Sequence, residues 1–202
     1  MKKLITLFVA AVLCFSTANA QHYRGFADVT LTIPVAVKMG GENISYETAK
    51  GFFPGFTTTH GVQLKNFFVG AGVGAFLTPS LDYSCLLTGF IDGRYDFFNM
   101  NKANLFIDCK LGYPIIAGDG DVDMVEPNGD DFFIGEAKCT APYFNPSVGV
   151  RFRFSKNCGI NIALGYLPLA VKGLDYGSNY DPTDIEVKFT DHRLSLTIGF
   201  DF

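Results

Sequence analysis

Apolar and polar residues alternate one by one up to the last residue of the chain. Successive side chains of a strand point to opposite faces, so this ending predicts a strand with one apolar face and one small or polar face. Such a strand suits a barrel wall with lipid outside and a polar lumen inside. Leu194, Leu196, Ile198, Phe200 and Phe202 form the apolar face, and Ser195, Thr197, Gly199 and Asp201 form the other.

The same period of two recurs along the chain and predicts eight strands. After residue 20 no apolar run is long enough for a spanning helix. Connections are short after the second, fourth and sixth strands and long after the first, fifth and seventh, whereas the link after the third is brief where a long one is expected. The expected strands are 23–38, 55–64, 66–78, 84–98, 103–116, 142–154, 159–171 and 191–202.

Alternating short turns and long loops are typical of outer-membrane barrels, with short turns in the periplasm and long loops outside the cell. The predicted fold is therefore all-β: an eight-stranded antiparallel up-and-down transmembrane β-barrel with both termini on the periplasmic side. A secreted β-sandwich is the rival fold, because its strands alternate too. In a sandwich the apolar face would point inward.

Charges in the predicted strands fall on the lumen face. Lys or Arg facing lipid at the midplane costs about 2–4 kcal/mol, so this placement supports the barrel. Eight strands enclose an interior just wide enough to be filled by side chains, where charges must pair or meet water. Five acids and five bases favour a plugged, ion-paired interior over an open channel. The predicted lumen charge network is Asp28, Asp92, Arg94, Asp96, Asp108, Lys110, Arg151, Arg153, Arg193 and Asp201.

The N-terminus has the layout of a cleavable export signal. It is basic at Lys2 and Lys3, apolar from 4 to 15, and ends in an A-x-A site at 18–20. We expect a signal peptide over 1–20 and a barrel domain over 21–202. Losing the two lysines moves the net charge from −4 to −6, which disfavours nucleic-acid partners.

The strand pattern and the closing segment 196–202 (LTIGFDF) resemble a known family, the small eight-stranded outer-membrane β-barrels (OmpX-like and OmpA-barrel-like, often labelled porin family). The resemblance covers 21–202 and implies residence in the cell outer membrane of a Gram-negative bacterium, surrounded by outer-membrane lipid. It also implies that Phe202 is an assembly signal read by the barrel-assembly machinery. No catalytic motif of the family can be carried over, and we expect a monomer without a cofactor.

An acidic stretch at 118–131 lies in the third long loop. Asp119, Asp121 and Asp123 occupy positions one, three and five of a Ca²⁺ loop, which needs several convergent oxygens. Met124 stands where that loop requires glycine, and Asp130 replaces the bidentate glutamate. A solvated acidic loop is the better interpretation, and no metal site is expected.

Four cysteines follow the export signal into an oxidising compartment. Cys85, near the outer end of the fourth strand, and Cys139, late in the third long loop, fall on the same predicted side, so they are a candidate disulfide. Cys109 faces lipid and Cys158 lies in a periplasmic turn, so neither joins them easily.

Histidines supply little catalytic chemistry. His60 falls on the lipid face of a poorly patterned strand unless a bulge at Gly61 turns it away. His192 and Ser195 are three residues apart, on opposite faces of their strand, so they do not form a nucleophile and base.

The sequence therefore predicts a non-enzymatic barrel with a structural or surface-interaction role through its extracellular loops, which would contact any extracellular ligand. The alternative is a low-conductance pore for small solutes. An outer-membrane lipid-modifying enzyme is a further, less favoured hypothesis.

Overall fold

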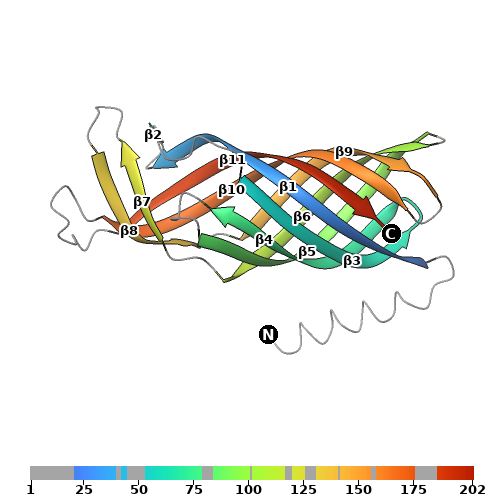
Figure 1. Ribbon diagram of the computed structural model, residues 1–202, viewed down its shortest axis with the longest axis horizontal. Coiled ribbons are helices and arrows are strands. Elements are labelled where there is room, and N and C mark those ends of the chain that lie inside the picture. Colours follow the sequence, from blue (N-terminus) through green and yellow to red (C-terminus); the bar gives the residue numbers. More distant parts are fainter. Residues whose placement is uncertain are drawn as a thin grey trace.

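Eight long strands follow one another around an antiparallel barrel (Figure 1), which confirms the predicted fold. The computed structural model describes residues 21–39, 42–44, 53–78, 84–100, 102–116, 120–125, 131–140, 142–155, 158–175 and 186–202. The expected signal peptide lies outside these residues. The wall strands are β1 (Gln21–Met39), β3 (Phe53–Leu64), β4 (Phe67–Thr78), β5 (Ser84–Asn99), β6 (Ala103–Ile116), β9 (Tyr143–Arg153), β10 (Gly159–Asp175) and β11 (Glu186–Asp201).

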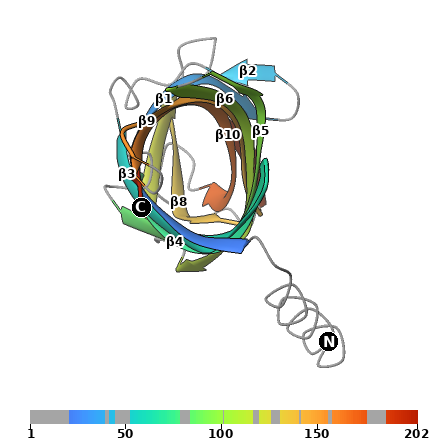
Figure 2. The same ribbon diagram turned by 90° about the vertical axis from the view of Figure 1, so that its right-hand side faces the viewer.

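The first and last strands close the barrel. β11 pairs with β10 on one side and with β1 on the other, where Ile198 lies opposite Val29. Past the end of β11, the backbones of Phe202 and Gly25 exchange two hydrogen bonds of 2.8 and 3.0 Å. The end-on view shows the resulting ring of strands (Figure 2). Closure removes the unpaired edges that β1 and β11 would otherwise expose.

The two faces of the wall have opposite chemistry. Outward side chains are apolar and exposed, for example Val29 at 52% and Leu164 at 55%, whereas Asp28 and Asp92 point inward and are at most 1% exposed. A water-soluble sandwich would bury its apolar face and expose its charges. This inverted arrangement belongs to a barrel with lipid around it, so the β-sandwich alternative is wrong. Among the described residues, no helix has the length and apolar character to cross a bilayer.

A bulge in β1 corrects the expected alternation of that strand. The register of β1 against β11 shifts between Pro34 and Ala36, so Val35 is 54% exposed whereas Val37 is 2% exposed. The sequence pattern places both valines on the lipid face. Proline has no backbone N–H to give to the ladder, and a bulge is where a strand tolerates this loss.

The long loops contain three strands that the sequence pattern does not predict: β2 (Glu42–Ile44), β7 (Gly120–Val125) and β8 (Asp131–Cys139). β7 and β8 form a hairpin, and β8 pairs with the upper part of β10, where Cys139 lies opposite Val171. The expected solvated acidic loop is therefore partly a sheet, continuous with the wall (Figure 1). At the other end the connections are short, and Gln21 and Phe202 lie there too.

Gly199 leaves room for two polar side chains that meet above it. Asn161 Nδ2 donates to Asp28 Oδ1 at 3.4 Å, and a Cβ on Gly199 would overlap that carboxylate oxygen and press on Asn161. We expect Gly199→Ala to destabilise the barrel by about 1–3 kcal/mol through overpacking. Urea titration of the detergent-folded protein, read by heat-modifiable gel migration, measures this loss. The matched control is Gly93→Ala, because a Cβ there meets nothing within 4 Å; equal losses in both variants would contradict the prediction.

Candidate functional site: the charged interior

The barrel brings the predicted lumen charges together in its interior. All but one of the ten are buried, and Arg153 is the partly exposed member at the short-turn end. A buried charge is tolerated only when it is paired and hydrogen-bonded, so the pairings decide what the interior can do. The buried members are Asp28, Asp92, Arg94, Asp96, Asp108, Lys110, Arg151, Arg193 and Asp201.

A cross-strand ion-pair cluster occupies the middle of the barrel. The β5–β6 register sets Arg94 opposite Asp108 and Asp92 opposite Lys110. Arg94 donates to Asp108 at 2.9 Å, and Lys110 Nζ lies 3.4 Å from a carboxylate oxygen of Asp28. Lys110 is also 3.6 Å from Asp108. The cluster therefore joins β1, β5 and β6 across the lumen.

Aromatic rings enclose the Arg94 guanidinium. Its central carbon lies 4.0 Å from the ring centroid of Phe26 and 4.3 Å from that of Phe106. Phe68 meets Phe26 edge-on, with 4.9 Å between the ring centroids. A desolvated cation between ring faces gains about 2 kcal/mol or more. These groups fill the lumen at mid-height.

A second layer lies nearer the long-loop end. Arg193 pairs with Asp191 at 2.5 Å and lies over the ring of Phe53. Beside it, Asn145 donates to Ser195 at 3.1 Å. Apolar residues share this part of the lumen: Phe76, Leu86, Phe90, Tyr143, Leu167, Leu169 and Phe189 are all buried.

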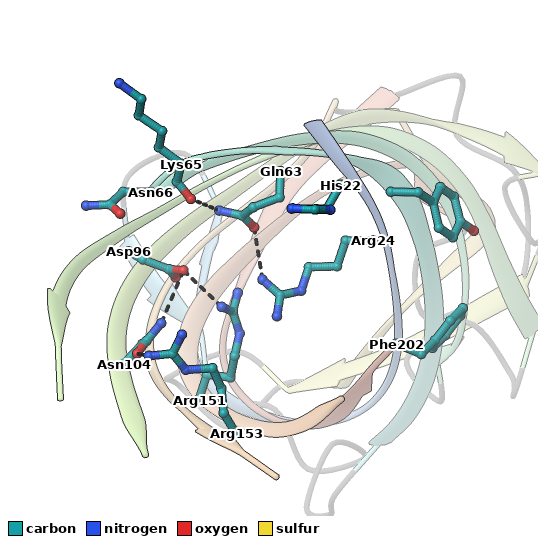
Figure 3. Close-up of a pocket in the computed structure, with 11 residues that line it drawn as sticks. His22, Arg24, Gln63, Lys65, Asn66, Asp96, Asn104, Arg151, Arg153 and Phe202 are labelled. Carbon is teal, nitrogen blue, oxygen red and sulfur yellow. Dashed lines mark hydrogen bonds and ion pairs between the residues drawn. The ribbon is translucent and has the colours of Figure 1, made fainter. Parts of the chain in front are cut away.

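The third layer, at the short-turn end, lines a cavity of about 520 Å³ (Figure 3). Arg24 pairs with Asp201 at 2.6 Å, and Arg151 donates to Asp96 at 2.9 Å. Arg153 donates to the Asn104 side chain at 2.8 Å. The cavity opens toward the end that carries both described termini.

Sequence reasoning missed two charged members of the interior, Arg24 and Asp191. The alternation of faces along a strand could have predicted both. Arg24 shares the face of Asp28 on one strand, and Asp191 shares the face of Arg193 on another. The alternation also places Phe26 and Phe106 on the inward faces of their strands, with Asp28 and Asp108. It does not show that their rings stack on Arg94.

The expected disulfide is not formed. Cys85 is exposed and carries a free thiol. It lies on β5, whereas the backbone of Cys139 pairs with β10, and β6 and β9 stand between these strands in the wall. Lying at the same end of a barrel does not bring two residues to the same side of its circumference.

The weak calcium candidate stays untested, because Asp119 lies outside the described residues. Asp121 and Asp123 belong to strand β7. In the part of the chain that the structure describes, no group of three or more His, Cys, Asp or Glu side chains could hold a metal ion.

His60 stays on the outer face, because β1 and β3 pair evenly past Gly61. Its two ring nitrogens lie 2.5 Å from the Tyr23 hydroxyl and 3.1 Å from the Thr58 hydroxyl. His192 and Ser195, considered above as base and nucleophile, lie on opposite sides of the barrel wall. Ser195 is buried inside, whereas His192 contacts the Tyr166 hydroxyl. Side-chain partners therefore engage both ring nitrogens of His60 and Nδ1 of His192.

No family model matches the chain, and no curated protein matches it. Solved structures are similar in fold. Neisserial surface protein A is 11% identical, over 90% of this chain and 98% of that one, with a TM-score of 0.50. Ail, the attachment invasion locus protein of Yersinia pestis, is 10% identical over 90% of this chain and 98% of that one, with a TM-score of 0.41. The outer membrane protein AlkL is 14% identical over 92% of this chain and 93% of that one, with a TM-score of 0.46. The chain thus has the fold of the small eight-stranded outer-membrane barrels.

The Arg94–Asp108 pair should be energetically coupled. We expect Arg94→Gln to cost about 3–5 kcal/mol, because it leaves Asp108 buried with less compensating charge. Adding Asp108→Asn should restore part of that stability, so the double variant loses less than the sum of the single losses. Urea titration of the three variants measures the coupling. Additive losses would contradict it, and the partly exposed Arg153→Gln, expected to lose about 1 kcal/mol or less, is the control.

Proposed function

We propose that the protein is an integral outer-membrane barrel, exported by a signal peptide over 1–20, that conducts no solute and catalyses no reaction. It acts through the structure at its long-loop end, as a structural or surface-interaction protein. The protein would be a monomer surrounded by outer-membrane lipid. The barrel-assembly machinery would recognise Phe202, and any extracellular ligand would bind the long loops.

One observation carries the closed-barrel part of this proposal. Arg94, at 2% exposure, is held between Phe26 and Phe106 and bonded to Asp108, so ion pairs and rings fill the lumen at mid-height. A conducting pore needs a continuous polar path, which eight strands provide only if their inward side chains leave space. Here those side chains contact one another across the lumen.

The long-loop end supports a role at the surface. β10 and β11 pair as far as Leu174 and Glu186, and the β7–β8 hairpin adds to the same sheet through β8. The loops at this end are therefore supported by a paired sheet. Loops on a rigid scaffold commonly carry binding functions. The short-turn end has no comparable projection among the described residues (Figure 1).

Conductance in planar bilayers tests the closed interior. We expect no steady channels from the wild-type protein. Removing both rings that flank the buried guanidinium, by Phe26→Ala with Phe106→Ala, should produce a measurable ion current. Phe152→Ala, which trims an exposed outward ring, is the control and should stay silent. Steady channels of defined size in the wild type would instead support the low-conductance pore.

Epitope tags test the orientation. A tag inserted between β7 and β8 should bind antibody on intact cells, because the proposal places this hairpin outside the cell. A tag in the two-residue turn at Lys65 and Asn66 should bind only after the outer membrane is permeabilised. The reverse pattern would overturn the orientation, and labelling of a soluble periplasmic fraction would overturn membrane residence.

A further inference from the structure

We infer that the cavity at the short-turn end binds a small oxyanion, a phosphate or carboxylate group that enters where the two described termini lie. The cavity measures about 520 Å³, within the range of small-molecule sites. Side chains from β1, β3, β5, β6 and β9 converge on it (Figure 3). The polar and charged residues that line it include Arg24, Gln63, Lys65, Asp96, Asn104, Arg151 and Arg153.

The charge of this lining is positive in a chain whose net charge is −4. Arg24, Arg151 and Arg153 face two carboxylates, Asp96 in the lining and Asp201 beside Arg24, whereas the Lys65 ammonium points away from them (Figure 3). The site therefore keeps an excess of one positive charge. A concave site with low-dielectric walls concentrates such a potential and attracts counter-ions.

Arg151 has donors to spare. Its side chain is 1% exposed, and one terminal nitrogen donates to Asp96. Nε forms an ion pair with Asp201 at 3.7 Å, beyond hydrogen-bond distance, and the other terminal nitrogen donates to no acceptor among the described residues. A charged donor that is left unpaired in a buried site costs more than a neutral one. An oxyanion beside Arg151 would take up this unused capacity.

Arg153 adds a charge that no hydrogen-bonded carboxylate offsets. Its acceptors are the neutral Asn104 side chain at 2.8 Å and the Met100 carbonyl at 3.5 Å. A guanidinium presents parallel N–H groups that match the two oxygens of a carboxylate or phosphate. Arg24 is already committed, since it bonds both Asp201 and Gln63. Arg151 and Arg153 are therefore the expected ligand-binding pair.

Calorimetric titration of the detergent-folded full-length protein tests the site, with pyrophosphate and succinate as separate probes at constant ionic strength. We expect saturable one-to-one binding of at least one probe, weakened tenfold or more by Arg153→Gln. Arg153→Lys keeps the charge and loses the planar fork, so it should fall between that variant and the wild type. Lys102→Gln removes the same charge from an exposed position at this end that does not line the cavity, and should bind as the wild type does.

The two probes separate the sources of the oxyanion: binding of pyrophosphate alone indicates a phosphate ligand, and binding of succinate alone a carboxylate. Absence of saturable binding by either probe would overturn the inference. Equal weakening by Lys102→Gln would do so too, because it would reduce the effect to general charge. Heat-modifiable migration checks the fold of each variant. Channel currents bear on the closed interior alone, so the two proposals fail separately.

Discussion

Hydrogen bonding of the backbone in lipid is the constraint on which this structure depends. Hydrocarbon offers no partner to an N–H or C=O group, so a sheet that crosses it must close on itself. β1 and β11 meet this requirement with an unbroken register from Phe26 to Pro34, extended by the backbone bonds between Gly25 and Phe202. Closure then determines which face of every strand meets lipid and how wide the interior is.

The narrow interior explains why its side chains pair as they do. Inward arginines and aspartates cannot reach bulk water at mid-height, and each gains most from a partner across the lumen. Arg94 contacts two phenyl rings as well as Asp108, so these side chains meet in the lumen at mid-height. At the short-turn end, three arginines, Arg24, Arg151 and Arg153, meet two carboxylates.

Much of the fold was predictable because alternation in the sequence is a direct image of the two faces of a strand. The inward placement of Asp28, Arg94 and Asp201 follows from it without any knowledge of contacts. The prediction from this alternation failed where other local structure changed the facing of a strand or formed an additional strand. Pro34 introduced a bulge that moved Val37 inside, and the hairpin of β7 and β8 formed in a stretch that its acidic composition assigned to a loop.

By itself, then, the sequence determined the number of wall strands, their facing and the inward position of most charges, because these depend only on neighbours along the chain. The tertiary structure decided which charges pair, that Cys85 stays apart from Cys139, and that a cavity with surplus arginine donors lies at one end. Those properties depend on the order of strands around the circumference and on side chains meeting across the lumen. Residues such as Arg24 and Asp201 are remote in sequence and become neighbours only when the barrel closes.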